Sequence, residues 1–144
     1  MERIDQMQGI SIEPTTRLKP LFGSEQELEE FRARHNRHAV ARKDIEGYEG
    51  RCFLGLDVGS TTTKAALIDE EGAILHSYYG SNEGNPLKSV RKAVLELYDA
   101  LPKGARISNS VVTGYGEGLI KAALKVDIGE IETVAHYKAA NFFR

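Results

Sequence analysis

Short apolar runs, separated by glycine-rich or charged turns, predict alternating strands and helices from residue 51 onward. Residues 53–58 and 65–68 are two apolar runs of strand length, joined by a Gly/Ser/Thr turn. Residues 73–79 are interpreted as a third strand, antiparallel to the second, and residues 107–113 as a fourth. The pattern therefore begins with a three-stranded antiparallel sheet.

Helices are predicted between and after these strands. Asn85 and Pro86 are suited to the N-cap and the first position of a helix. The apolar face of that helix would consist of Leu87, Val90, Val94, Leu97 and Leu101. A shorter helix is expected over residues 117–124, burying Leu119, Ile120 and Ala123.

A final helix is expected from about residue 130. Its inward residues would be Ile131, Val134, Ala135, Ala139 and Phe142, with His136 partly buried beside them. The predicted order is β-β-β-α-β-α-α, an α/β fold with a mixed sheet. Its fourth strand should run parallel to the first because a helix connects the third strand to it. No fifth strand is expected.

The first 50 residues have a weaker pattern and are predicted to form an arm, a short helix and a linker, with the main domain at 51–144. Ser24 and Glu27 match a capping box that begins a helix to about His38, with Leu28 and Phe31 on its apolar side. Residues 32–43 contain five Arg or Lys and no acid. They are either an anion-binding patch or, as we favour, a solvated face balanced by the preceding acidic residues.

Composition restricts the class of protein. The chain has 144 residues, a net charge of −2 and one cysteine, Cys52. The charge gives no general reason to expect nucleic-acid or membrane binding, and no apolar segment reaches transmembrane length. A single cysteine excludes an internal disulfide and suits the cytoplasm, where Cys52 would be a small buried side chain.

The turn after residue 58 has the chemistry of a phosphate-binding loop. Gly59 lets the backbone approach an anion closely, and the four hydroxyl residues that follow add neutral donors. Asp57, at the end of the preceding strand, is suited to hold Mg²⁺ directly or through water. A hairpin with a polar turn is the alternative. Residues 114–118 form a second glycine-rich bend, either at a ligand-binding sheet edge or as a tight connection.

Several common catalytic motifs are absent from the sequence. It has no Gly-x-x-x-x-Gly-Lys-Ser/Thr loop, no Gly-x-Ser-x-Gly elbow and no dinucleotide-binding βα unit. The chain is therefore not expected to be a P-loop enzyme, a serine hydrolase or a Rossmann-type dehydrogenase.

Four motifs together resemble a known family. These are residues 54–65, the Ser81-Asn82 segment with Gly84-Asn85-Pro86, the Thr113-Gly-Tyr-Gly116 bend, and residues 132–140. They are similar to the activator ATPases of 2-hydroxyacyl-CoA dehydratases and benzoyl-CoA reductases, the BadF/BadG/BcrA/BcrD type. The first motif is shared by the actin-like superfamily, whereas the combination is more specific.

The resemblance implies half of an actin-like, ribonuclease H-like ATPase domain. Members of that family are cytosolic homodimers that hold one [4Fe-4S] cluster and use ATP hydrolysis to pass a low-potential electron to a dehydratase or reductase. By motif, Asp57 would be catalytic and would place Mg²⁺. The residues implied to bind ATP or ADP are Gly59, Ser60, Thr61, Thr62, Thr63, Lys64 and Gly114.

Parts of the family pattern are missing from the sequence. The second phosphate motif, Asp-Ile-Gly-Gly-Gln-Asp, should follow Phe143 but does not, and neither cluster cysteine is present. The chain is therefore expected to be a fragment that does not hydrolyse ATP by itself. The alternatives are a lobe of a sugar or acid kinase, which would need a longer insert near residues 80–86, and a non-enzymatic interaction module.

Overall fold

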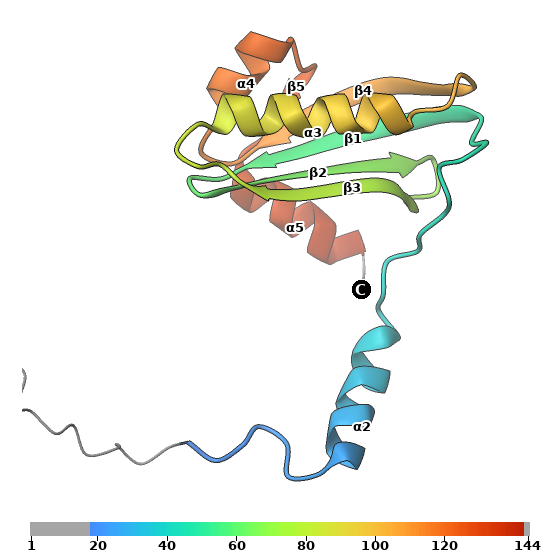
Figure 1. Cartoon of the computed structure of the whole chain (residues 1–144), viewed down its shortest axis with the longest axis vertical. Coiled ribbons are helices and arrows are strands. Elements are labelled where there is room, and N and C mark those ends of the chain that lie inside the picture. The colour runs from blue at the N-terminus through green and yellow to red at the C-terminus, as the bar shows by residue number, and fades with distance from the viewer. Residues whose placement is uncertain (1–17, 143–144) are drawn as a thin grey trace, which may run out of the picture. The chain divides into compact units, whose positions relative to one another are not determined.

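The computed structural model describes residues 18–142, which separate into two units between His38 and Ala39 (Figure 1). The first unit contains helix α2, Glu25–Asn36, which ends two residues before the predicted boundary. The Ser24 hydroxyl accepts from the Glu27 N–H, as predicted, but the Glu27 carboxylate accepts from the Gly23 N–H. The capping box is therefore confirmed on one side and shifted by one residue on the other.

The second unit is built on a five-stranded mixed sheet. Its strands are β1 (Gly50–Val58), β2 (Thr62–Asp69), β3 (Ile74–Ser81), β4 (Ala105–Thr113) and β5 (Ile128–Gly129). They are arranged in the order β3-β2-β1-β4-β5 (Figure 1). The antiparallel β1–β2 and β2–β3 pairs and the parallel β1–β4 pair are confirmed. The expectation of no fifth strand is wrong, because β5 pairs parallel with β4 at Val111 and Val112.

Three helices lie on the two faces of this sheet. Helices α3 (Pro86–Ala100) and α4 (Glu117–Leu124) cover one face, and α5 (Glu132–Phe142) lies on the other (Figure 1). The Asn85 side chain accepts from the Lys88 N–H, and Pro86 occupies the first turn of α3, as the sequence predicts. The residue ranges of α3 and α4 place the β3–β4 crossover and the bend after β4 where they were expected.

The core lies between the sheet and the α3/α4 layer. Its largest fully buried side chains are Leu67, Leu97, Ile120, Val58, Val90, Val112, Thr63 and Cys52. Cys52 is the small buried residue that was predicted, and burial raises the pKa of its thiol. The residues of the predicted linker also contribute, since Ile45 and Tyr48 pack against this cluster.

The predicted buried faces of the helices need correction. On α3, Ser89 and Ala93 join Val90 and Leu97 inside, whereas Leu87 is exposed. On α4 only Ile120 is buried, and Leu119 and Ala123 are exposed.

No side chain of α5 is buried, and Ile131 and Phe142 are each 69% exposed. Val134 and Ala135 are half-buried, and His136 is exposed rather than partly buried. Within the second unit, an apolar stripe on α5 is therefore not enough to bury the helix.

The segment before β1 is joined to the edge of the sheet. Residue Ile74 of β3 donates to the Ala41 carbonyl at 2.8 Å and accepts from the Lys43 N–H at 3.0 Å. The Lys43 ammonium lies 2.6 Å from a carboxylate oxygen of Asp69, which is only 4% exposed. This bond is the main cause that lowers the pKa of Asp69, and the backbone N–H groups of Ala73 and Glu71 lower it further.

Protonation of Asp69 at low pH should therefore lower the free energy of unfolding. Because its pKa is lower in the folded chain, the stabilisation is complete above the ordinary aspartate value and is lost as pH falls below about 4. In urea unfolding, Asp69→Asn should be less stable than the wild type at pH 7, and the difference in unfolding free energy should be smaller at pH 3. Glu71→Gln is the control, since its exposed carboxylate binds the same lysine. A constant gap at both pH values would contradict the assignment.

Candidate phosphate-binding site

The turn between β1 and β2 is shorter than its sequence suggests. Strand β2 begins at Thr62, so Gly59, Ser60 and Thr61 alone form the connection. The Gly59 N–H donates to the Thr62 carbonyl at 2.9 Å and closes the turn, while Ser60 and Thr61 are exposed. The exposed tip therefore presents one glycine and two hydroxyl side chains at the end of the hairpin.

Asp57 and Lys64 face each other across the hairpin. They are register partners, and the Lys64 ammonium lies 2.8 Å from Oδ2 of Asp57. The bond to Asp57 is the main cause that raises the pKa of Lys64, and the charges of Asp57, Tyr79 and Glu132 add to it. The two side chains are 25% and 44% exposed. The carboxylate is thus held near the surface with a cation already beside it.

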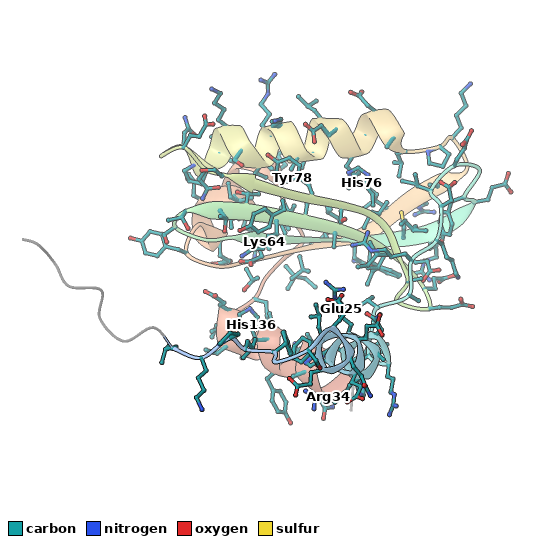
Figure 2. The ribbon with its side chains drawn as sticks, turned by 60° about the horizontal axis from the view of Figure 1, so that its bottom comes forward. Glu25, Arg34, Lys64, His76, Tyr78 and His136 are labelled. Atoms are coloured by element: carbon teal, nitrogen blue, oxygen red, sulfur yellow. The ribbon has the colours of Figure 1, made fainter. Side chains whose placement is uncertain are left out.

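These two residues lie on the sheet face that carries α5. Together with Gly55, Thr113 and Ala135 of α5, they line a pocket of about 240 Å³, and Figure 2 shows Lys64 on that side of the sheet. Side chains alternate along a strand, so Thr62 lies on the same face as Lys64. The Asp57–Lys64 pair and Thr113 therefore line a space on this face of the sheet.

The opposite side of the turn is held by Asn82. This residue follows β3, is 2% exposed, and donates through Nδ2 to the Gly59 carbonyl at 2.8 Å. Its Oδ1 accepts from the hydroxyl of Thr63, which is fully buried, at 2.6 Å. The Thr63 hydroxyl is therefore bound inside the protein and does not reach the exposed tip.

Gly114 lies in close contact with Asp57 and the end of β1. It has φ +94°, and a Cβ placed on it would lie 2.6 Å from the Val58 carbonyl oxygen and 2.9 Å from Oδ1 of Asp57. Two residues on, the Gly116 N–H donates to the Val58 carbonyl at 2.9 Å. The glycine-rich bend after β4 thus lies directly against the end of β1, which only glycine at residue 114 allows.

A model of the BadF/BadG/BcrA/BcrD ATPase family matches residues 54–144. The chain belongs to this family. The match begins inside β1 and covers the rest of the β1–β2 hairpin. It also covers the crossover, the glycine-rich bend after β4 and α5. A search of curated proteins found no match.

Solved structures give the same fold for this ATPase-family chain. The activator of the 2-hydroxyisocaproyl-CoA dehydratase from Clostridium difficile, solved with bound ADPNP, is 28% identical with a TM-score of 0.54, and the match covers 63% of this chain and 33% of that one. Component A of the (R)-2-hydroxyglutaryl-CoA dehydratase from Acidaminococcus fermentans is 22% identical, with a TM-score of 0.51 and coverages of 65% and 35%. The matched region spans about a third of each relative. The fold is that of an actin-like ATPase half-domain.

The structure brings most of the predicted site residues to one end of the hairpin. Asp57, Lys64 and Gly114 meet around the turn, whereas Thr63 points into the core. Asn82 was not assigned a role from the sequence. Its position between the end of a predicted strand and the Asn85 helix cap was the available signal.

Other kinds of site find little support in the part of the chain that the structure describes. No group of three His, Cys, Asp or Glu side chains in residues 18–142 could hold a metal ion. Cys52, the single cysteine of the sequence, is fully buried. No described helix is long and apolar enough to cross a membrane.

Proposed function

We propose that this chain forms the first phosphate-binding part of an ATP site, in a protein that activates a 2-hydroxyacyl-CoA dehydratase or a related reductase. The observation that carries the proposal is the arrangement of Asp57, Lys64 and the Gly59–Thr61 tip at one end of a hairpin, backed by Gly114. The Clostridium difficile relative, which has the same fold over this region, was solved with ADPNP. Nucleotide binding is therefore the most direct use of this site.

Each residue has a role that its position supports. The exposed tip would bind the phosphates through backbone N–H groups and the Ser60 and Thr61 hydroxyls. Lys64 would hold positive charge beside them, and Thr62 lies on the same face. Gly114 lets the bend after β4 approach Asp57. Thr63 was also expected to bind the nucleotide, but its hydroxyl donates to Asn82 inside the protein, so we assign it to the support of the turn and not to nucleotide contact.

The carboxylate of Asp57 fits a magnesium ion. It is partly exposed at the end of β1 and already has a cation, the Lys64 ammonium, at 2.8 Å. Mg²⁺ prefers one or two carboxylates together with phosphate oxygens and water. When bound, the ion would neutralise phosphate charge next to Asp57. The residues of the chain would position the phosphates.

The wider activity of the family extends beyond this chain. We propose that the parent protein is a dimer and couples ATP hydrolysis to low-potential electron transfer to a partner dehydratase. A [4Fe-4S] cluster does not fit the present residues, since the one cysteine is buried in the core. We expect the chain alone to bind nucleotide weakly and not to hydrolyse it. A kinase lobe is disfavoured because only residues 82–85 separate β3 from α3, which leaves no substrate-binding insert.

Binding of Mg-ADP to the isolated chain can be followed by amide chemical shifts. We expect Ser60, Thr61 and Gly114 to shift on titration, with a dissociation constant of roughly 1 mM, which corresponds to about 4 kcal/mol. Inorganic phosphate with Mg²⁺ is the matched probe for phosphate binding without the nucleoside, and Mg²⁺ alone is the control. Shifts confined to residues outside the turn, or none at about ten times that concentration, would contradict the proposal.

A further inference from the structure

We propose that Asn82 sets the conformation of the Gly59–Thr61 turn and is a positioning residue for the nucleotide phosphates. The nucleotide part of this inference rests on the function proposed above. Asn82 does not face the α5 side of the sheet, where Asp57 and Lys64 lie. It acts from the other side, between β3 and the start of α3.

Three hydrogen bonds connect Asn82 to the hairpin. Its Nδ2 donates to the Gly59 carbonyl at 2.8 Å, its backbone N–H donates to the Thr61 carbonyl at 2.8 Å, and its Oδ1 accepts from the Thr63 hydroxyl at 2.6 Å. Both side chains of the Asn82–Thr63 pair are almost fully buried. The bonds are therefore shielded from competition with water, and breaking one leaves a buried polar group without a partner.

The bond to Gly59 has a geometric consequence on the exposed side of the turn. In a trans peptide unit, the carbonyl of one residue and the N–H of the next point in opposite directions. The Gly59 carbonyl is fixed toward Asn82, so the N–H of Ser60 is directed away from Asn82, toward the open side of the turn. Successive N–H groups presented in this way are what binds an anion. Asn82 thus orients a donor without touching the ligand.

An amide side chain is the group that this position requires. Asn82 must donate to a carbonyl and accept from a hydroxyl at the same time. An aspartate would place a second acceptor against the Gly59 carbonyl. The Asn82 carbonyl also accepts from the Asn85 N–H at 2.7 Å, and the Asn85 side chain caps α3. The turn is therefore connected through one buried residue to the start of a core helix.

The test uses the whole chain, with two variants that break the Asn82 hydrogen bonds and two control variants. Asn82→Asp removes the donor to Gly59, and Thr63→Val removes the hydroxyl at nearly constant shape. Thr63→Ser keeps the hydroxyl, and Asn85→Ala weakens the cap of α3 without changing the turn contacts. Amide hydrogen exchange is measured in the core strands and at the Gly59 and Asn82 N–H groups, which donate to the Thr62 and Thr61 carbonyls of the turn. Mg-ADP affinity is measured by chemical shift titration well below each unfolding temperature.

We expect Asn82→Asp and Thr63→Val to speed exchange at the turn, leave the core strands slow, and weaken Mg-ADP binding about tenfold, which is the value of one ordinary hydrogen bond. Thr63→Ser should match the wild type. Asn85→Ala should lower the unfolding temperature but leave both turn readouts unchanged. Unchanged exchange and affinity in Asn82→Asp would overturn the proposal.

A pattern in Asn82→Asp that merely repeats that of Asn85→Ala would also overturn it, because the role would then be one of general stability. If the wild type does not bind Mg-ADP at all, the function proposed above fails. The exchange data would still decide whether Asn82 shapes the turn.

Discussion

Gly114→Ala is expected to destabilise the protein by about 3 kcal/mol, the sum of left-handed backbone strain and overpacking. Residue 114 has φ +94°, a conformation that alanine adopts only with strain. The added Cβ would also lie 2.6 Å from the Val58 carbonyl oxygen and 2.9 Å from Asp57 Oδ1. Both atoms belong to the end of β1, so relief of the contact must move the candidate site.

Urea unfolding with the matched variant Gly118→Ala tests this directly. Gly118 lies inside α4, and a methyl group added there would have nothing within 4 Å, so alanine should stabilise by roughly 0.5–1 kcal/mol. Glycine-to-alanine substitutions at residues 114 and 118 should therefore change the free energy of unfolding in opposite directions. A Gly114→Ala protein within about 0.5 kcal/mol of the wild type would show that the bend after β4 yields easily.

Asp57→Asn should remove the magnesium dependence of nucleotide binding. The substitution keeps the size of the side chain but removes the charge that a hard cation requires. It also leaves Lys64 without its partner carboxylate. We expect Mg-ADP to bind about 100-fold more weakly or undetectably, a difference of about 2.7 kcal/mol. The fold should change little, because a partly exposed ion pair contributes at most about 1 kcal/mol.

The comparison needs ADP titrations with and without Mg²⁺ in both proteins. Asp99→Asn is the charge-matched control, since Asp99 is exposed near the end of α3, outside the hairpin. It should bind as the wild type does. Magnesium-dependent binding that survives in Asp57→Asn would remove Asp57 from the metal site and leave the turn as a metal-free phosphate site.

The order of the main elements could be predicted because it is encoded locally. Apolar runs bounded by turn residues mark β1 to β4, and the Asn85-Pro86 pair marks the start of α3. The two-residue strand β5 could not be recognised, since it is too short to carry a period. The burial of α4 and α5 was misjudged because an apolar stripe shows which side prefers to be covered, not whether a second layer is present to cover it.

Part of the candidate site could be predicted because its signal is also local in the sequence. Asp57, Gly59 and Gly114 carry their signal in residue type and in their place next to a strand. Thr62 and Thr63 were expected to belong to the turn, although β-branched threonine favours a strand, and the structure extends β2 over them. The contacts of Asn82 span 19 and 23 residues of sequence, so no local pattern reveals them.

The pairing of residues 41–43 with β3 also determines where the chain can be shortened. A protein that begins at residue 51, the predicted start of the main domain, would lose the ion pair of Lys43 with Asp69 and the packing of Ile45 and Tyr48. It would uncover an edge strand, which invites association with other chains. Removal of residues up to 38 leaves all of these contacts in place. A shortened protein that starts at Ala39 therefore keeps the whole second unit.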